Sequence, residues 1–577
     1  MPIRFTDRIW RALRAAPWLT AALFTLAHTA LTLSTRALWF SDEVRYANAY
    51  ENVVRAGKWV VLQLNGMPYP DKPPLYFWWV GLFDALTPAD MPEVFFVAVA
   101  ASGLVYLWAS LWLYRAMGLG KGERLAALLV LLANFFLLGL LHYSRMDLLF
   151  CAAILAAQAC LYRGLARGDA VNGRWTVAGL ALGGVATLIK GPLGLAFPLL
   201  TAAAFLAWRG RLRRLFSRPV LLGLLAALAL LLAWALAATL VEGWDFMYDL
   251  VYTQIYKRAT DTFHHAEPWS YYFIALPLAW LPWTLALAVA PWRRLIRASH
   301  WAGLWRSRKT AEPDRDADAW LWCLFLTGFA LLSVLSGKVL IYILPLFPAL
   351  AMLTARRLRA LGAAPRFWAC VAGLLAVLGA ALLAAGPLDH LFLPEGVDLS
   401  GTWAAGAVLL AGAAWLWRVR AADARAGLLA LAVVLAAWIQ PVGLWLAPSL
   451  DPVMSPKQTG ELLRGYIAKG YTPAAYHIYA GIFTYYAGQD ILETDDTAEV
   501  ARLVEDEDRL ALVIRRRNWE DWTDRPEGMR LVHEQTISGQ DYLLLVHDEG
   551  DADGMTDGMV AGPSAGDETG RSEEHTS

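Results

Sequence analysis

The sequence predicts an all-α polytopic membrane protein with about thirteen transmembrane helices, followed by a small extracytoplasmic α/β domain. Of its 577 residues, 58% are hydrophobic and 17% are charged, whereas a soluble chain carries roughly 25% charged residues. Uncharged apolar stretches recur from position 17 to position 447, and each approaches the roughly 20 residues that a helix needs to cross a bilayer. After position 451 the apolar segments become shorter, which indicates a water-exposed domain.

The transmembrane part divides into segments that hydropathy places along the first 447 residues. The expected spans are 17–38, 92–114, 123–141, 146–162, 174–190, 192–208, 219–241, 269–292, 319–336, 339–355, 366–386, 402–417 and 425–447. Every second loop between them is rich in Arg and Lys, as is the N-terminus, and the positive-inside rule assigns these basic loops to the cytoplasm. The outer side therefore receives loops 39–91 and 242–268 and everything after position 448.

The chain after position 447 divides into a folded domain and a tail. Ala511–Arg515 and Asp541–His547 have the pattern of strands, and Gln458–Ala468 has that of a helix. We therefore expect an extracytoplasmic α/β domain at 448–550. Residues 551–577 are rich in Gly, Asp and Ser and are expected to be disordered. The last of them, 571–577, read RSEEHTS, which a common sequencing-adapter DNA would encode in one frame, and we expect them to be an artefact.

Two adjacent carboxylates, Asp42 and Glu43, open the first outer loop. Apolar residues recur at helical spacing after them, and Gly57 suits a helix C-cap, which predicts an amphipathic helix along the membrane surface. Two explanations of the carboxylates are open. Either they complement the dipole of a helix that Ser41 caps, or they supply a catalytic carboxylate at the membrane interface.

Three lysines, Lys72, Lys190 and Lys338, stand on the predicted outer side, against the positive-inside bias. Lys72 precedes a Pro-Pro helix start with Asp71 at the expected cap, and a helix N-terminus attracts anions. The other two lysines lie in tight turns between spans. Snorkelling at a helix end would explain one such lysine. Three on one face favour a pocket for a lipid-borne phosphate, because ionisable groups at membrane depth are functional by default.

Other polar residues fall on the same face. Arg145 and Asp147 occupy a very short outer turn, and Tyr342 follows Lys338 by one helical turn. Asp71 and His265 lie on two outer loops and are a candidate pair for Zn²⁺ or another divalent ion, since both side chains are common ligands. No cofactor is certain from this pair alone.

In their order along residues 15–355, these motifs resemble those of one known family, the C-type polytopic glycosyltransferases. The resemblance is strongest to bacterial lipid A aminoarabinose transferases and their relatives among protein mannosyltransferases. The matching elements are Asp42-Glu43-Val44-Arg45-Tyr46, Leu64-Asn65-Gly66, Asp71-Lys72-Pro73-Pro74, Arg145-Met146-Asp147, Lys190-Gly191-Pro192, His265-Ala266-Glu267-Pro268-Trp269, and Lys338 through Tyr342-Ile343-Leu344-Pro345. Each motif is short, but the ordered set is specific.

The resemblance implies a C-type glycosyltransferase fold and a role for each matched residue. It makes Asp42 the leading catalytic carboxylate, with Glu43 and Asp147 as further catalytic candidates. The donor-phosphate pocket that it implies consists of Arg45, Lys72, Lys190, Lys338 and Tyr342. It also makes Asp71 and His265 the metal pair. Close aminoarabinose transferases usually have Glu where this chain has Asp71, which leaves both the metal and the sugar open.

The resemblance further implies an enzyme, a glycosyltransferase that depends on a polyprenyl-phosphate-linked pentose or hexose. The expected acceptor is a lipid A-type glycolipid or another extracytoplasmic acceptor, including protein. The expected partners are membrane lipids, the lipid-linked donor and the acceptor, with no nucleic acid. The expected location is the bacterial inner membrane, as a multi-pass protein with its active site on the periplasmic face.

Three other functions would also fit many spans: a secondary transporter, a lipid-linked-sugar flippase and a protein O-mannosyltransferase-like enzyme. Transporters usually place ionisable residues near the middle of the bilayer, in broken helices. In this sequence the span centres hold almost no ionisable residues, and the charges gather at the outer boundary. This placement favours a transferase.

Overall fold

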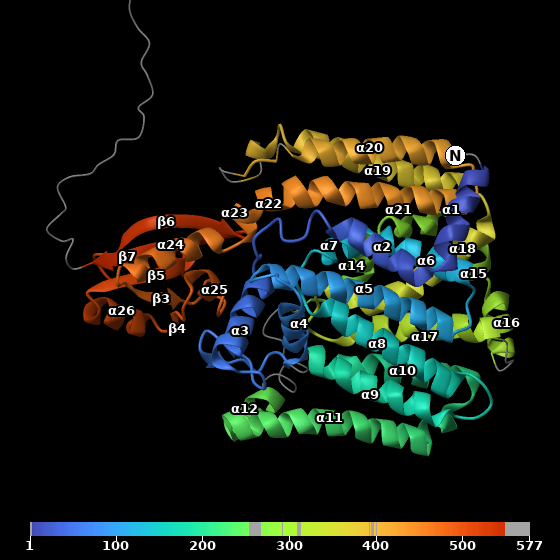
Figure 1. Ribbon diagram of the computed structural model, residues 1–577, viewed down its shortest axis with the longest axis horizontal. Helices are drawn as coiled ribbons and strands as arrows, with labels where there is room; N and C mark the ends of the chain where they lie inside the picture. Colours follow the sequence, from blue (N-terminus) through green and yellow to red (C-terminus); the bar gives the residue numbers. More distant parts are fainter. Residues whose placement is uncertain are drawn as a thin grey trace, which may run out of the picture.

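The structure, a computed structural model, describes residues 3–252, 267–290, 292–308, 313–391, 393, 397–399 and 401–548. Long helices lie side by side in one part of the molecule, and a five-stranded sheet with short helices lies at one end of them (Figure 1). The predicted fold class, a helical polytopic membrane protein with a small C-terminal α/β domain, is confirmed. The tail expected at 551–577 lies outside the described residues.

The helical part alternates long helices with short turns. Up to position 252 its helices are α1 (Ile3–Ala15), α2 (Pro17–Thr29), α3 (Asp42–Ala56), α4 (Leu75–Leu86), α5 (Glu93–Ala116), α6 (Lys121–Leu132), α7 (Phe135–Leu140), α8 (Asp147–Leu161), η1 (Tyr162–Ala166), α9 (Gly173–Lys190), α10 (Leu193–Arg209), η2 (Leu212–Phe216), α11 (Arg218–Glu242) and α12 (Trp244–Tyr248). From position 267 they are α14 (Tyr271–Ala279), η4 (Trp283–Val289), α15 (Trp292–Leu295), α16 (Ala298–Ser307), α17 (Pro313–Val334), η5 (Leu340–Leu346), α18 (Phe347–Leu361), α19 (Pro365–Ala385), η6 (Asp389–Leu391), α20 (Thr402–Val419), α21 (Ala424–Pro441), η7 (Val442–Leu446) and α22 (Ala447–Ser449).

Eight helical segments among the described residues are long and apolar enough to cross a membrane. They are Glu93–Ala116, Asp147–Ala166, Arg218–Glu242, Asp314–Val334, Leu340–Leu361, Pro365–Ala385, Thr402–Val419 and Ala424–Ser449. A ninth is added if α14 and η4, which are bent by 101°, form one span. The thirteen predicted spans all overlap helices, but the number thirteen is not confirmed, because several of these helices are short.

Two of the predicted spans break where polar side chains intervene. In the span expected at 17–38, α2 ends at Thr29 and the chain continues without a regular helix. In the span expected at 123–141, Asn134 separates α6 from α7: its side chain accepts a hydrogen bond from the Leu137 amide (2.8 Å) and donates one to the Ala279 carbonyl (2.9 Å). Such side chains satisfy backbone groups that a broken helix leaves unpaired at membrane depth.

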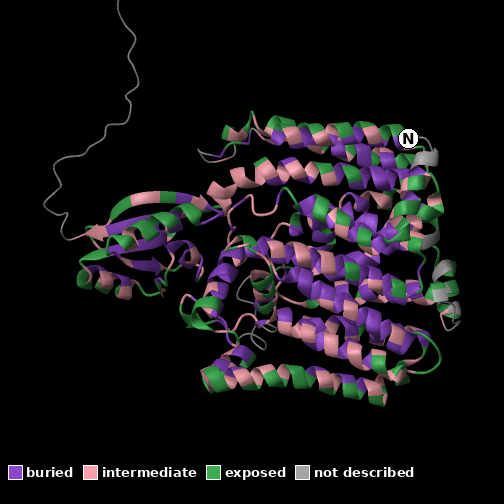
Figure 2. Ribbon diagram, viewed as in Figure 1, coloured by how far each residue is buried: buried purple, intermediate pink, exposed green. Residues whose placement is uncertain are grey.

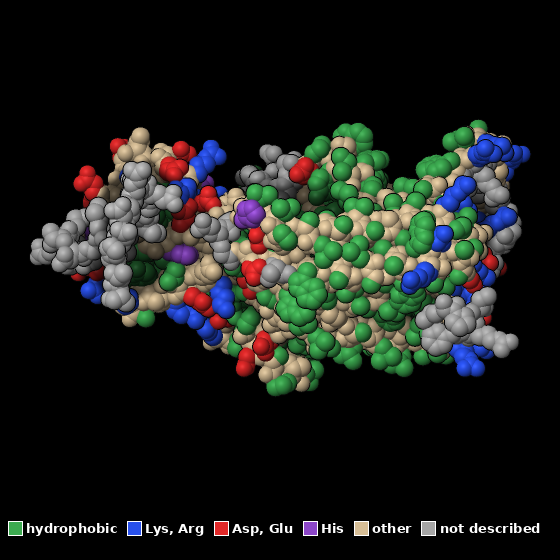
Figure 3. Space-filling view, turned by 90° about the horizontal axis from the view of Figure 1, so that it is seen from above, with side chains coloured by type: hydrophobic (Ala, Val, Ile, Leu, Met, Phe, Trp, Pro, Cys, Tyr) green, Lys and Arg blue, Asp and Glu red, His purple; other side chains and the backbone are tan. Residues whose placement is uncertain are grey.

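The surface of the helical part is apolar along its middle (Figure 3). In α11 the side chains of Leu221, Leu225 and Leu236 are exposed, whereas α5 and α8 are largely buried between other helices (Figure 2). A helix that is apolar all round and still exposed is compatible with lipid rather than water around it. Lys and Arg side chains gather at the end far from the sheet (Figure 3). The chain is therefore a multi-pass membrane protein with a basic end opposite its C-terminal domain.

The C-terminal domain is built on a sheet of order β4-β3-β5-β7-β6. Its elements are α23 (Asp451–Met454), α24 (Lys457–Ala468), β3 (Thr472–Tyr476), α25 (Thr484–Ala487), β4 (Leu492–Thr494), α26 (Thr497–Asp506), β5 (Arg509–Arg515), α27 (Arg516–Asp521), β6 (Arg530–Ile537) and β7 (Gln540–Asp548). β5 pairs parallel with β3 and antiparallel with β7, and its centre is buried on both faces, which explains its continuous apolar run. The strands predicted in Ala511–Arg515 and Asp541–His547 and the helix predicted in Gln458–Ala468 are confirmed.

Helix α3 lies between the C-terminal domain and the rest of the helical part (Figure 1). It ends at Gly57, whose φ of +66° gives the left-handed C-cap that the sequence predicts. The Ser41 side chain makes no capping hydrogen bond, so the capping explanation of the two carboxylates is not supported. Every residue from Glu43 to Tyr50 is buried, so this part of α3 lacks the exposed polar face of the predicted amphipathic helix. The helix is covered from both sides: Arg45 donates to the Ala480 carbonyl, and the Tyr50 ring packs edge-on against Phe95.

Candidate active site

A chain of ion pairs connects three elements at the end of the helices nearest the C-terminal domain. Arg145 Nη2 lies 2.7 Å from Asp42 Oδ2 at the start of α3, and Arg145 Nε lies 3.2 Å from Asp147 Oδ2. Asp147, the first residue of α8, also pairs with Lys190, the last residue of α9. Negative and positive groups thus alternate from Asp42 to Lys190. The structure brings together Asp42, Asp147 and Lys190, which the sequence placed in three separate motifs.

Local backbone structure places these side chains at helix ends. Asp147 stands in the first turn of α8 and Lys190 in the last turn of α9, and each charge there complements the helix dipole. Gly191 ends α9 with a φ of +122°, a conformation open to glycine and strained for other residues. The Lys-Gly-Pro motif is therefore a helix terminator that leaves the lysine at the end of α9, paired with Asp147.

Lys72 and Arg45 face the same carboxylate. The charges of both raise the stability of ionised Asp42, and Arg45 Nη1 lies 3.9 Å from Asp42 Oδ1. Burial by itself raises the pKa of Asp42, but the positive charges of Arg145, Lys72 and Arg45 outweigh burial and lower that pKa to about 2. Asp42 is consequently a carboxylate at neutral pH.

The pKa of Lys72 is lowered, whereas a simple ion pair with a carboxylate would raise it. Burial lowers it to about 8, although Asp42 and Asp71 act to raise it. Arg45 and Lys190 contribute to lowering it, because like charges repel. The cations of the site are Arg45, Lys72, Arg145 and Lys190, and its carboxylates are Asp42, Asp71 and Asp147. The excess of positive charge suits an anion.

Two buried tyrosines at this site have hydroxyls without a hydrogen-bond partner among the described residues, Tyr46 and Tyr69. Burial raises the pKa of both, and the charge of Asp42 raises it further. An unpaired buried hydroxyl is unfavourable, so each is available to a ligand beside Asp42. Tyr46 stands in a matched motif, but neither Tyr46 nor Tyr69 has a role predicted from the sequence, because an aromatic residue at an apolar position is indistinguishable from core.

Arg145 is the other residue whose role the sequence analysis missed. It was part of a matched motif but was not assigned to the site, yet it pairs with both Asp42 and Asp147. The signal was present, since an arginine in an outer turn opposes the positive-inside bias in the same way as the outer lysines.

Glu43 was predicted to be catalytic, but its contacts in the structure indicate a different role. Its carboxylate accepts two hydrogen bonds from Arg36 (2.7 and 2.8 Å), one from the Trp39 amide (2.8 Å) and one from the Ser144 amide (2.5 Å). The side chain is fully buried, and these four bonds use the acceptor sites of a carboxylate. Glu43 therefore fixes the irregular segment before α3 to the turn before α8, which is a structural role.

Lys338 and Tyr342, both predicted to line the donor-phosphate pocket, lie in different surroundings. Tyr342, in η5, lies with its ring 4.6 Å from Lys190 Nζ, so it belongs to the cluster. Lys338 is buried, and its ammonium donates to the carbonyls of Glu267 (2.8 Å), Leu335 (2.5 Å) and Ser336 (3.5 Å). An ammonium has three N–H donors, and here backbone carbonyls accept from them. The geometry gives Lys338 a role in holding the turn before η5 rather than at the phosphate.

The metal pair predicted from Asp71 and His265 is not assembled from described residues, because His265 lies outside them. Within the described ranges, no group of three or more His, Cys, Asp or Glu side chains is arranged to hold a metal ion. The metal therefore stays a prediction.

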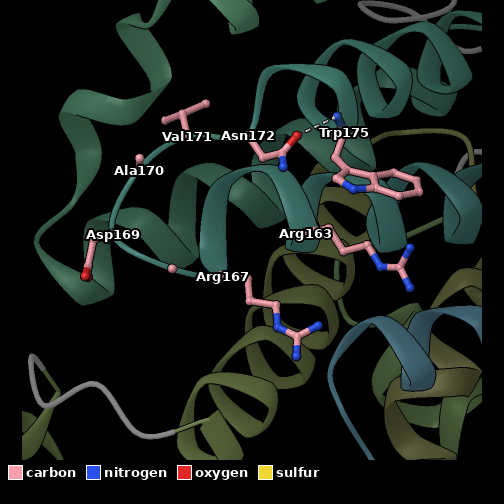
Figure 4. A pocket seen from close by; sticks show the side chains of 8 residues that line it. Arg163, Arg167, Asp169, Ala170, Val171, Asn172 and Trp175 are labelled. Atoms are coloured by element: carbon pink, nitrogen blue, oxygen red, sulfur yellow. Dashed lines mark hydrogen bonds between the residues drawn. The ribbon is translucent and has the colours of Figure 1, made fainter.

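A hollow of about 470 Å³ lies at the opposite end of the helices, beside the connection from η1 to α9 (Figure 4). Arg163 and Arg167 line it, with Trp175 and Asn172 at the start of α9. The 20-residue segment Asp147–Ala166 separates it from Asp147, a length of about 30 Å at the helical rise of 1.5 Å per residue. This hollow is therefore distinct from the ion-pair cluster.

Comparison with known proteins relates the chain to one group of membrane enzymes. Residues 71–236 match the family model described as dolichyl-phosphate-mannose-protein mannosyltransferase. The chain is 30% identical, over 427 residues, to the undecaprenyl phosphate-α-4-amino-4-deoxy-L-arabinose arabinosyl transferase of Pseudomonas aeruginosa PAO1, covering 72% of this chain and 70% of that protein. The protein of the same description from Pseudomonas paraeruginosa PA7 is 30% identical over 433 residues, covering 74% and 73%.

The fold is similar to that of ArnT from Cupriavidus metallidurans. The crystal structure of its apo state matches with a TM-score of 0.69 at 19% identity, covering 97% of this chain and all of that one. The structure bound to undecaprenyl phosphate matches with a TM-score of 0.66 at 18% identity, covering 96% and 99%. At this identity the likeness establishes a common fold over nearly the whole chain.

Proposed function

Because the chain belongs to the family of undecaprenyl phosphate-α-4-amino-4-deoxy-L-arabinose arabinosyl transferases, we propose that it transfers this amino sugar from undecaprenyl phosphate to a lipid A-type glycolipid. The observation that supports this most strongly is the ion-pair chain from Asp42 to Lys190, in which an ionised carboxylate lies among four cations. A phosphate and a reacting sugar need both kinds of charge. The cluster lies where the apolar segment Asp147–Ala166 begins, which suits a donor whose phosphate is attached to a long lipid.

The reaction breaks the bond between the anomeric carbon of the sugar and a phosphate oxygen of the carrier. Negative charge grows on that oxygen as the bond breaks, and positive charge grows on the sugar. Lys72, Arg45 and Lys190 would stabilise the leaving phosphate, and fixed charges of this kind are usually the largest single contribution to catalysis. The acceptor oxygen forms the new bond to the anomeric carbon, and undecaprenyl phosphate leaves.

The role of Asp42 follows from its low pKa. A general base works best when its pKa lies near the working pH, and a carboxyl with a pKa of about 2 is a weak base. A phosphate acceptor on lipid A is already ionised near neutral pH and needs no base. We therefore assign Asp42 to orienting the sugar and stabilising its developing positive charge, which favours a phosphate acceptor over a hydroxyl.

The proposed location is the inner membrane, with the site on the periplasmic face. The gathering of Lys and Arg at the end opposite the C-terminal domain supports this orientation (Figure 3), because basic ends stay in the cytoplasm. The ion-pair cluster lies at the other end, together with the C-terminal domain.

The experiment is sugar transfer by the purified full chain in proteoliposomes that contain lipid A, analysed by mass spectrometry of the lipids. Undecaprenyl-phosphate-linked 4-amino-4-deoxy-L-arabinose is expected to yield lipid A heavier by one amino sugar. The matched control replaces the donor with the corresponding nucleotide sugar, which is expected to yield no product. Modification of lipid A only with the nucleotide sugar, or with neither donor, would contradict the proposal.

A further inference from the structure

The C-terminal domain contacts the candidate active site at Arg45 of α3. Its Nε donates to the carbonyl of Ala480 (2.9 Å), and its Nη1 donates to the hydroxyl of Tyr479 (2.8 Å). The guanidinium also lies 4.2 Å from the centre of the Tyr479 ring. Arg45 Nη2 makes no hydrogen bond to a described residue. The domain therefore holds the guanidinium by Nε and Nη1 and leaves the Nη2 amino group to a ligand.

The loop that carries Tyr479 is itself fixed to the first outer loop. Gly481 has a φ of +73°, which strains residues other than glycine, and a Cβ there would stand 2.6 Å from Leu64 Cδ1 of β1 (Gln63–Leu64). The Gly481 amide donates to Glu493 (2.7 Å). This local packing sets where Tyr479 stands relative to α3.

Asn65 makes the main contact on the other side of the same junction. It lies in the two-residue turn between β1 and β2 (Met67–Pro68), with a φ of +50°. Its side chain donates to the Ile491 carbonyl (2.6 Å) and accepts from the Ile491 amide (2.8 Å), while its own amide donates to Asn48 of α3 (2.8 Å). Docking of the domain therefore does not need Tyr479, which is directed at Arg45 instead.

Asp451 secures the domain at the start of the first outer loop. Its carboxylate accepts from the Ala37 amide (2.9 Å) and from Trp39 Nε1 (2.8 Å). The domain is thus anchored on both sides of Asp42, through contacts that are independent of Arg45. A substitution at Tyr479 can consequently change the site without detaching the domain.

We propose that Tyr479 is a positioning residue that holds Arg45 against Asp42, so that the C-terminal domain completes the site for the carrier phosphate. This rests on the proposed function above. A guanidinium held by two hydrogen bonds and a ring face has little freedom left to lose when charge grows on the phosphate, and such preorganisation strengthens electrostatic stabilisation. Without Tyr479, Arg45 would retain its charge but lose its fixed orientation.

The test is a double-mutant cycle on the full chain, with binding of undecaprenyl phosphate and donor kinetics as separate readouts. Tyr479→Ala is expected to weaken undecaprenyl phosphate binding and to lower kcat/KM for the donor about tenfold, the size expected for one charge-assisted hydrogen bond. Tyr479→Phe keeps the ring and the fold, and is expected to lie between the wild type and Tyr479→Ala. In an Arg45→Ala background, Tyr479→Ala is expected to have no further effect, since it acts through Arg45.

The matched control is Tyr476→Ala, in β3 of the same domain, where the ring packs 5.6 Å from that of Trp522 instead of against α3. It is expected to leave both readouts near the wild type. Additive losses from Tyr479→Ala and Arg45→Ala, or equal effects of Tyr479→Ala and Tyr476→Ala, would overturn the positioning role. The binding readout separates the two proposals: carrier binding coupled to Tyr479 without any sugar transfer by the wild type would refute the proposed function alone.

Discussion

The guanidinium of Arg145 lies 2.7 Å from the carboxylate of Asp42, so the first outer loop and the turn before α8 meet in one ion pair. This contact brings together residues about a hundred positions apart in the sequence, and Arg145 is the strongest of the cations that lower the pKa of Asp42. The state of charge of the candidate catalytic carboxylate therefore depends on a residue outside its own loop.

Replacing Arg145 with Ala is expected to raise the pKa of Asp42 from about 2, because the largest of the positive charges that oppose burial is lost. A carboxyl with a higher pKa is protonated at a higher pH. The pH profile of kcat/KM, which reports the free enzyme, is expected to stay level down to about pH 5 for the wild type and to fall on the acid side for Arg145→Ala. An unchanged acid limb would show that Arg145 does not control Asp42.

Replacing Lys72 with Ala is expected to lower kcat for transfer by roughly a hundredfold, because the charge on the leaving phosphate is greatest in the transition state. Lys58→Ala is the matched control: Lys58 is on the same outer loop, but it lies 3.9 Å from Glu242 and outside the cluster. Turnover by Lys58→Ala is expected to be near that of the wild type. Equal turnover by the two variants would mean that Lys72 only snorkels.

The lowered pKa of Lys72, about 8, predicts how donor use changes in alkaline solution. Below this pKa the ammonium is charged, and as the pH rises through it the charge is lost. The kcat/KM for the donor is therefore expected to fall between about pH 7 and pH 9. Lys72→Arg is expected to flatten this fall, because arginine stays charged there. A flat wild-type profile would place the ammonium outside the donor site.

Replacing Glu43 with Gln tests the structural role that the fold assigns to it. The change leaves the buried Arg36 without its ion pair, and breaking a buried pair typically costs roughly 3–5 kcal/mol. A large fall in thermal stability in detergent is therefore expected. Glu51→Gln, on the same helix, breaks only the pair with the exposed Arg55 and is expected to change stability by about 1 kcal/mol at most. A stable, inactive Glu43→Gln protein would restore its predicted catalytic role.

The sequence predicted the fold class and the helical segments well, because a bilayer imposes long apolar runs and separates charges by side. It did not yield the number of spans, since side chains such as Asn134 satisfy the backbone where a helix breaks inside an apolar run. Periodicity cannot distinguish such a break from a continuous helix.

Within the candidate site, the sequence identified most of the charged residues, but it did not show which of them are structural and which face a ligand. Arg36 fell inside an expected span, so its pairing with Glu43 could not be foreseen, and Glu43 was assigned to catalysis. Tyr479 lies 434 positions from Arg45, in a domain whose docking no local pattern describes. The role of Glu43 and the contact of Tyr479 with Arg45 both depend on burial and long-range contacts. A single sequence does not show these without its fold.

The ion-pair cluster around Asp42 is proposed to catalyse sugar transfer from undecaprenyl phosphate. The most direct measurement is single-turnover transfer to lipid A in proteoliposomes by the wild type and by Asp42→Asn, which keeps the shape of the side chain and removes its charge. We predict transfer by the wild type and a loss of at least about a hundredfold in the variant, with undecaprenyl phosphate still bound. Transfer by Asp42→Asn at nearly the wild-type rate would contradict it.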